Sequence, residues 1–269
     1  MREAILNTLS SIEADKDVTI LHAVESGSRA WGFESPDSDW DVRFIYLEQG
    51  ERYDSIFSDW RDVIEHQSPV GKIVNNIPAK LDLDITGWDL RKALKLLYKG
   101  NPPLLEHFRS PIVYKSLPSF NRVIDLMPIM YSPKATLYHY FHMAKNNYRE
   151  YLKGPKVWVK KYLYVLRPCM CIHWITIHSS LPPVNIYNLM AGLAFKDELL
   201  NDVKILLNKK QNGDELSFGG RIHSIDWYIR YWLEEYEIPN VAITNIRGDE
   251  YKQLIDKVFR DVREDHWQL

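Results

Sequence analysis

The chain has 269 residues, of which 45% are hydrophobic and 13% aromatic, enough to form a packed core in one large domain or in two. It carries 34 Lys and Arg residues against 36 Asp and Glu residues, for a formal net charge of −2. This balance excludes a protein that coats nucleic acid through overall positive charge, but it leaves room for an enzyme with a local basic groove.

The first part of the chain combines helical and strand patterns. Apolar residues at helical spacing predict a helix over residues 2–12. Residues 18–24, VTILHAV, are apolar and largely β-branched, and they predict a strand that ends at the turn formed by Ser26 and Gly27. A short helix is expected to open at this glycine. After the turn SPDSD, the segment VRFIYL predicts a second strand.

The pattern weakens over residues 51–80, where DVIEH predicts one strand. The segment AKLDLDIT then alternates with period two, which places Asp82 and Asp84 on one face of a strand and the apolar residues on the other. Directly after it, GWDLRKALKLLYKG predicts an amphipathic helix over residues 87–100. The prolines of NPPLLEHF favour the first turn of a further helix.

From about residue 132 the sequence changes character. Long helices joined by Pro and Gly turns are predicted over residues 132–152, 156–178, 195–211 and 220–236. We therefore expect an N-terminal part of about 130 residues that mixes strands and helices, followed by a C-terminal helical part.

The cysteines and the apolar runs indicate the compartment. Cys169 and Cys171 are the only cysteines, so neither a disulfide framework nor a zinc site built from cysteines is expected, and a reducing cytoplasm fits. No run approaches the roughly 18 apolar residues of a membrane-spanning helix. We expect a cytoplasmic protein that does not enter a membrane.

Two pairs of acidic residues suggest a metal site. Asp39 and Asp41 stand two residues apart where the second strand begins, so they point the same way, as do Asp82 and Asp84 on their strand. If the two strands are neighbours, three or four carboxylates converge, and their mutual repulsion requires cations. Hard oxygen ligands suit Mg²⁺, and two such ions polarise an attacking hydroxyl and stabilise a leaving pyrophosphate.

The turn before these acids offers a place for phosphates. Gly27 lets the backbone come close to a ligand, amides at a helix start face an anion, and Ser28 adds a hydroxyl donor. Each feature alone has a plainer reading: Gly-Ser as a turn, DSDWD as a solvated turn, and DLD as the solvent face of an edge strand. Their combination, with Asp-x-Asp entering an apolar strand and a third acidic strand about forty residues later, favours a site.

The pattern resembles a known family. Gly-Ser, Asp-x-Asp and a third acid, on strand, short helix, strand and strand, resemble the DNA polymerase beta superfamily of nucleotidyltransferases. The segments GSRAWGFESPDSDWDVRFIYL, DITGWDLRKALKLLYKGNPPLLEHF and KKYLYVLRPCMCIHWI look like the bacterial and phage polymerase-beta-like family associated with RNA repair. The resemblance implies an α+β protein with a catalytic domain over residues 1–130, built on a mixed sheet flanked by helices, and a helical nucleotide- and substrate-binding domain over residues 131–269.

The resemblance also implies roles for single residues. Gly27 and Ser28 would hold the β and γ phosphates of a nucleoside triphosphate. Asp39 and Asp41 would hold two Mg²⁺ ions. Asp84 would complete the metal site and orient or deprotonate the acceptor hydroxyl, with Asp82 as the alternative third acid.

Basic residues near these positions are candidates for phosphate contacts. Arg29 adjoins the turn, and Arg43 lies on the same strand face as the acids, either as a phosphate ligand or as an ion-pair partner of the acid cluster. In the resembling family the helix around residue 162 borders the nucleotide, which implies Lys161, Tyr162 and Arg167 as nucleotide-binding residues. A solvated basic edge is the plain alternative. The nine Trp and sixteen Tyr residues are chiefly expected in the core, although aromatic rings also stack on bases.

These patterns predict an Mg²⁺-dependent nucleotidyltransferase that moves a nucleoside monophosphate from a triphosphate to a hydroxyl and releases pyrophosphate. The resemblance favours an RNA 3′ end, such as that of a damaged tRNA, as acceptor. A protein hydroxyl, as in antitoxin-like members, or a small molecule is the alternative. A catalytically silent nucleotide- or RNA-binding protein on the same fold is a further one. No motif in the sequence indicates which nucleotide is used, whether a template takes part, or the oligomeric state.

Overall fold

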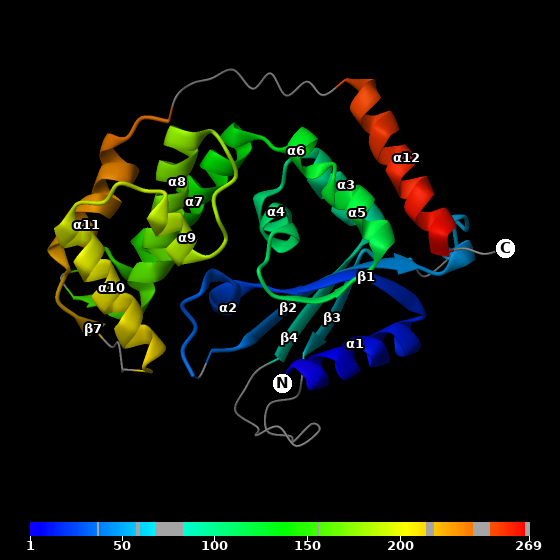
Figure 1. Ribbon diagram of the computed structural model, residues 1–269, viewed down its shortest axis with the longest axis horizontal. Coiled ribbons are helices and arrows are strands. Elements are labelled where there is room, and N and C mark those ends of the chain that lie inside the picture. The colour runs from blue at the N-terminus through cyan, green and yellow to red at the C-terminus, as the bar shows by residue number, and fades with distance from the viewer. Residues whose placement is uncertain are drawn as a thin grey trace. The chain divides into compact units, whose positions relative to one another are not determined.

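The computed structural model describes residues 1–36, 38–57, 60–67, 83–154, 156–213, 218–238 and 248–266 (Figure 1). The chain forms two compact units. The first consists of Met1–Ala30, Asp39–Tyr131 and Thr244–Leu269, and the second of Trp31–Ser38 and Ser132–Ile243.

The first unit is built on a five-stranded sheet. Its strands are β1 (Val18–Glu25), β2 (Trp40–Glu48), β3 (Val63–Gln67), β4 (Leu83–Asp89) and β5 (Val113–Ser116). They are ordered β3-β4-β2-β1-β5, and only the central pair β2 and β4 is parallel. The sheet is therefore mixed, and together with the many helices it confirms the predicted α+β class.

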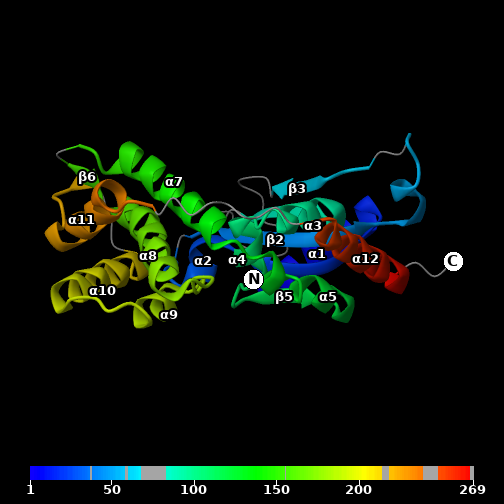
Figure 2. The ribbon, with the colours of Figure 1, turned by 90° about the horizontal axis from the view of Figure 1, so that it is seen from above.

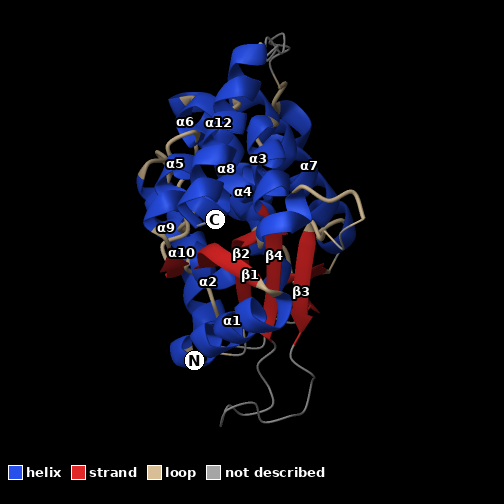
Figure 3. Ribbon diagram, turned by 90° about the vertical axis from the view of Figure 1, so that its right-hand side faces the viewer, coloured by secondary structure: helices blue, strands red, loops and turns tan. Residues whose placement is uncertain are grey.

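Helices cover both faces of this sheet (Figures 2 and 3). Helix α1 (Arg2–Lys16) packs Ile5, Leu9 and Ile12 into a core that includes Val42 and Phe44 of β2. The opposite face is met by α3 (Leu90–Tyr98) and α4 (Pro102–Phe108). Because side chains alternate along a strand, the β2 residues between the core positions point away from α1. The remaining short elements of the unit are α2 (Gly27–Trp31), η1 (Gly50–Tyr53), η2 (Pro118–Phe120), α5 (Asn121–Ile124) and α6 (Met127–Met130).

The helix predicted over residues 87–100 starts later than expected. The segment Gly87–Asp89 is the end of β4, paired with β2, and α3 begins at Leu90. Asp89 sets this boundary, because its side chain accepts the N–H of Arg91 and caps the helix. The apolar periodicity of the segment continues across the junction, so it does not reveal where the strand ends.

The capping carboxylate of Asp89 is fully buried, and it also accepts a hydrogen bond from the Tyr53 hydroxyl. Burial raises the pKa of Asp89 from 3.8 to about 6. Folding therefore favours the protonated form, so this group's contribution to stability is present below pH 3.8 and is lost as the pH rises through about 6.

Replacing Asp89 by Asn is expected to remove this pH dependence while keeping an oxygen for the helix cap. Between about pH 4.5 and pH 7.5, the free energy of unfolding of Asp89→Asn should gain on the order of 2 kcal/mol relative to wild type. Urea titrations at several pH values measure this difference, with the exposed Asp15→Asn as a matched control. A difference that stays constant over this range would show that Asp89 does not titrate with a raised pKa.

The C-terminal helix returns to the first unit. Helix α12 (Asp249–His266) packs against α3 and α5, and the His266 ring hydrogen-bonds the Ser119 hydroxyl at 2.8 Å. The division at residues 131 and 132 lies next to the boundary expected from the sequence. The expected helical domain 131–269 differs from the second unit in two places, since α12 lies outside it and Trp31–Ser38 lies within it.

The second unit is mainly helical. Its elements are α7 (Pro133–Tyr151), β6 (Val157–Trp158), η3 (Val159–Lys161), α8 (Tyr162–His178), α9 (Ile186–Ala191), α10 (Asp197–Gln211), β7 (Phe218–Gly219), α11 (His223–Arg230) and the π-helical turn η4 (Tyr231–Glu235). The helix predicted over residues 156–178 is thus shorter, because its first residues form β6, which pairs with β7, and the turn η3.

The core of this unit centres on α8 and holds both cysteines as buried, free thiols. Phe33 joins this core, and the ring of Trp31 lies 4.6 Å from the Arg167 guanidinium, so the segment that follows α2 is anchored here. None of the helices in the described ranges is both long and apolar enough to cross a membrane. The cytoplasmic location stays a prediction.

Candidate active site

The acidic residues predicted to form a site lie where β1 ends and where β2 and β4 begin. Asp41 is the second residue of β2, and Asp84 is the second residue of β4. Because these strands are parallel and pair Asp41 with Asp84 directly, the two carboxylates stand side by side. They lie on the face of the sheet opposite α1, since Val42 of β2 points into the core shared with that helix.

A single arginine joins the two carboxylates. The Nη2 atom of Arg43 lies 2.8 Å from Asp84 Oδ2 and 3.4 Å from Asp41 Oδ1. Its Nη1 atom also donates to the Asp84 backbone oxygen at 3.2 Å. All three side chains keep 22–38% of their surface exposed, so the group is open to solvent. Of the two alternatives for Arg43, the ion-pair partner matches this arrangement.

The protonation of Asp41 reflects its crowded surroundings. Burial raises the pKa of the Asp41 carboxyl above its ordinary value, Arg43 opposes this rise, and the neighbouring Asp84 and Asp39 carboxylates add to it. Three carboxylates thus lie near Arg43 and Arg29, and a further cation would be attracted to them.

The glycine turn touches the acidic pair directly. Gly27 opens α2 with φ +60°, a conformation that favours glycine. A Cβ atom added here would lie 2.1 Å from Asp41 Oδ2, so only glycine leaves room for the carboxylate. Ser28 follows at the start of the short helix and is largely buried. The two halves of the predicted site are thus in contact.

Arg29 and Asp39 shape the loop that leads into β2. The Arg29 Nε atom donates to the Asp39 backbone oxygen at 3.0 Å, and its guanidinium lies 3.7 Å from the centre of the Trp40 ring. The Asp39 side chain is exposed. The predicted alternative acid, Asp82, lies outside the described residues.

A buried glutamate that the sequence analysis did not single out positions Asp41. Glu25 is completely buried at the end of β1; its Oε1 accepts the Asp41 N–H at 2.9 Å and its Oε2 accepts the Tyr114 hydroxyl at 2.5 Å. The Ser26 N–H in turn donates to the Asp41 backbone oxygen at 2.7 Å. Burial raises the pKa of the Glu25 carboxyl. In the sequence, the signal that could have pointed to Glu25 is its acidic side chain at the end of a largely apolar strand.

Comparison with known proteins assigns the chain to a family. Residues 1–261 match the family described as the RNA repair pathway DNA polymerase beta family. The chain belongs to this family. The RNA repair pathway polymerase beta assignment agrees with the resemblance carried by the Gly-Ser and Asp-x-Asp motifs, and it indicates a nucleotidyltransferase of the polymerase beta type.

Two similar proteins add detail. A curated relative from Bacillus subtilis (strain 168), "Uncharacterized protein YcgL", is 43% identical over 235 residues, covering 87% of this chain and 86% of the relative. A crystal structure of a nucleotidyltransferase-like protein from Exiguobacterium sibiricum 255-15 is 11% identical and covers 97% of this chain and 89% of its own. The TM-score between the two structures is 0.31.

The acidic pair of this polymerase-beta-type protein fits a divalent cation. Asp41 and Asp84 offer hard anionic oxygens, and both already contact one positively charged nitrogen, so a single cation can reach both. Among the described residues, no group of three or more His, Cys, Asp or Glu side chains is arranged to hold a metal ion. The described residues thus offer two carboxylate ligands for one ion, and the two-ion site stays a prediction.

The nucleotide-binding residues predicted in the second unit do not share one environment. Lys161 packs its ammonium against the rings of Tyr151 and Tyr164, at 4.6 and 5.0 Å from their centres. Tyr162 is fully buried, and its hydroxyl accepts the N–H of Ile222 at 3.3 Å. Tyr162 thus packs inside the unit, and its contact with a nucleotide stays a prediction.

Arg167 is likewise buried, with 2% of its surface exposed. Its Nη2 atom donates to the Val184 oxygen at 3.1 Å. As with Tyr162, the contact of Arg167 with a nucleotide stays a prediction. Helical spacing placed them on α8 but did not reveal which side of α8 faces the core.

Removing the Glu25 side chain is expected to destabilise the site. Glu25→Ala leaves the Asp41 N–H and the Tyr114 hydroxyl without these acceptors, which should lower the free energy of unfolding by about 3 kcal/mol. Tyr114→Phe removes one donor only and should lower it by about 1 kcal/mol. Urea unfolding measures both. Equal stability of Glu25→Ala and wild type would show that Glu25 does not hold the site together.

Proposed function

We propose that this protein catalyses Mg²⁺-dependent transfer of a nucleoside monophosphate from a nucleoside triphosphate to a hydroxyl group. The acceptor oxygen forms a bond to the α-phosphorus, the bond from this phosphorus to the β-bridging oxygen breaks, and pyrophosphate leaves as the hydroxyl proton is released. The observation that carries the proposal is the direct pairing of Asp41 with Asp84 beside the Gly27 turn, in a chain of this family.

The acidic residues would bind the metal and the acceptor. Asp41 and Asp84 would hold the cation, with Asp39 joining them when substrate is bound. When bound, Mg²⁺ supplies charge neutralisation on the phosphate oxygens and polarises the attacking hydroxyl. Asp84 is the residue we assign to orienting the acceptor hydroxyl and accepting its proton, because its carboxylate is the more exposed of the two.

The turn and the arginines would bind the triphosphate. Gly27 brings the backbone close to the acids, and Ser28 adds a hydroxyl donor at the same turn. Arg29 and Arg43 supply positive charge on either side of Asp41. Asp41 and Asp84 would hold the cation, and Arg43 beside them would contact a phosphate. Lys161 stays a predicted nucleotide-binding residue.

The acceptor we favour is the 3′ end of an RNA, such as a damaged tRNA, and the support for it is the RNA repair pathway in the family's description. The test is incubation with Mg²⁺, each α-labelled nucleoside triphosphate and mixed RNA, protein and small-molecule acceptors, beside an Asp39→Ala/Asp41→Ala variant. Label on RNA with wild type alone is the expected result. Label on protein or on a small molecule would overturn the choice of acceptor, and no difference between wild type and variant would overturn the enzyme.

A further inference from the structure

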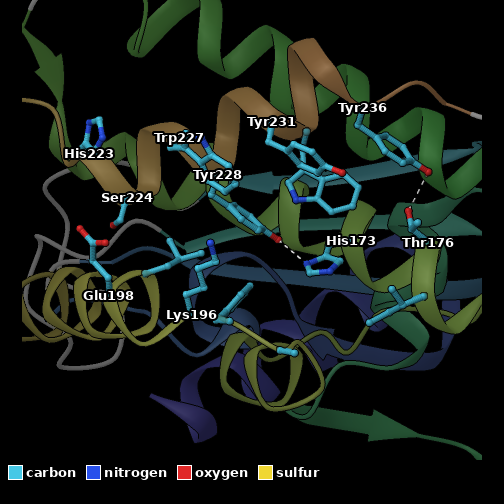
Figure 4. Close-up of a pocket in the computed structure, with 15 residues that line it drawn as sticks. His173, Thr176, Lys196, Glu198, His223, Ser224, Trp227, Tyr228, Tyr231 and Tyr236 are labelled. Carbon is cyan, nitrogen blue, oxygen red and sulfur yellow. Dashed lines mark hydrogen bonds between the residues drawn. The ribbon is translucent and has the colours of Figure 1, made fainter.

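The second unit contains a cavity that none of the roles above uses. It has a volume of about 530 Å³, within the range of small-molecule sites. Residues of α8, α10, α11 and η4 line it, together with Lys196 just before α10 (Figure 4). The π-helical turn η4 forms part of its wall, a backbone irregularity that often accompanies functional sites.

Two exposed aromatic rings stand at this cavity. Trp227 and Tyr231 are four residues apart, and their rings are stacked with centres 6.0 Å apart and an interplanar angle of 17°. Trp227 is 56% exposed and Tyr231 is 38% exposed, unlike most of the aromatic residues of this unit. A flat pair of rings that faces solvent is a platform on which another planar ring can stack.

Charged and polar groups accompany the rings. The Lys196 ammonium lies 5.8 Å from the centre of the Trp227 ring, and across the described residues it forms no ion pair, so it can meet a phosphate. Glu198 and His223 also line the cavity and are exposed. Deeper inside, the His173 Nδ1 and the Tyr228 hydroxyl share a hydrogen bond of 3.1 Å. The cavity therefore offers a stacking surface, a cation, and both donors and acceptors.

We propose that this cavity binds an unpaired nucleotide of a single-stranded RNA, with the base stacked on Trp227 and Tyr231 and its phosphate near Lys196. The inference deepens the proposed function, on which its choice of RNA rests, by giving the acceptor strand a binding site in the second unit. A nucleobase presents a ring face for stacking and an edge with both donors and acceptors, which the lining matches.

Binding of a labelled, short single-stranded RNA to the full-length protein tests this, with fluorescence anisotropy as the readout. Trp227→Ala should weaken RNA binding by about tenfold or more, because each stacked base contributes substantially. Trp227→Phe, which keeps a ring, should retain most of the affinity. Lys196→Ala should weaken binding less, and should also reduce its dependence on salt.

The matched controls are Tyr187→Ala, which removes another exposed ring of this unit, and Lys204→Ala, which removes another exposed lysine. Both should bind RNA like wild type. Wild-type RNA affinity in a folded Trp227→Ala protein would overturn the proposal, as would an absence of RNA binding by wild type. The proposal would also be overturned if Trp227→Ala lost the binding of free triphosphate but bound RNA like wild type. The same holds if Trp227→Ala lost only the labelling of a protein acceptor.

Failure of this inference is distinguishable from failure of the proposed function. In an Asp41→Asn background, where nucleotide transfer is reduced, Trp227→Ala should still weaken RNA binding. If no nucleotide is transferred by wild type but Trp227→Ala still loses RNA binding, the cavity is an RNA site and only the proposed chemistry is wrong.

Discussion

Replacing Asp41 by Asn is expected to lower the rate of nucleotide transfer by at least about 10³-fold. The substitution removes one of the two anionic oxygen ligands proposed for the cation, whose stabilisation of the transition state amounts to several kcal/mol, with each 1.4 kcal/mol equal to about tenfold in rate. The fold should persist, because Asn keeps the backbone N–H that donates to Glu25 and relieves the repulsion that raises the pKa of Asp41. Initial rates of label transfer from an α-labelled triphosphate measure the loss.

The third acid is identified by the same assay. Asp84→Asn should be as inactive as Asp41→Asn, because the two carboxylates form one pair with Arg43. Asp82→Asn should retain most of the activity, and the exposed Asp15→Asn serves as the matched surface control. An inactive Asp82→Asn beside an active Asp84→Asn would reassign the third carboxylate. Full activity of Asp41→Asn would remove the acidic pair from the mechanism.

Gly27→Ala is the second change with a large expected effect. The alanine Cβ would meet the Asp41 carboxylate at 2.1 Å, and the backbone there has φ +60°. We expect transfer to fall by about 10²-fold or more, because a misplaced metal ligand and phosphate turn disturb the reacting geometry. The free energy of unfolding should fall by about 1–3 kcal/mol, since both the left-handed conformation and the steric conflict disfavour the folded state.

Gly50→Ala separates the effect of the positive φ from the effect of the steric conflict with Asp41. Gly50 also has a positive φ, +30°, but an added Cβ there meets no atom within 4 Å. Gly50→Ala should therefore lose a little stability and no activity. Transfer rates and urea unfolding on both variants give the comparison. Should Gly27→Ala behave like Gly50→Ala, the close approach of the turn to Asp41 would have no bearing on function.

The local elements of the first unit were predictable because their patterns are short-range. The apolar run before Ser26 and the alternation around Asp84 both mark strands that the structure contains. Their pairing was not predictable in the same way, since alternation tells which face a side chain takes but not which strand lies next to it. From the sequence, the carboxylates converge only if their two strands are neighbours. The structure pairs β2 with β4 in parallel and places Asp41 opposite Asp84.

The features that the sequence did not reveal depend on long-range packing. Helix α12 returns to the first unit although more than a hundred residues separate it from α3, and nothing in its own periodicity encodes that partner. Tyr162 lies on the predicted helix, but its burial depends on the helices around it. Glu25 escaped notice because its role, accepting the Asp41 N–H, exists only once β1 and β2 have paired.

The central claim is that a nucleoside monophosphate, rather than a terminal phosphate, moves to the acceptor. The most direct test is a parallel incubation with Mg²⁺ and RNA in which the triphosphate is labelled at the α position or at the γ position. The account predicts label on the acceptor from the α-labelled triphosphate alone, with the γ label released as pyrophosphate. Transfer of the γ label to the acceptor, or release of free phosphate in place of pyrophosphate, would contradict it.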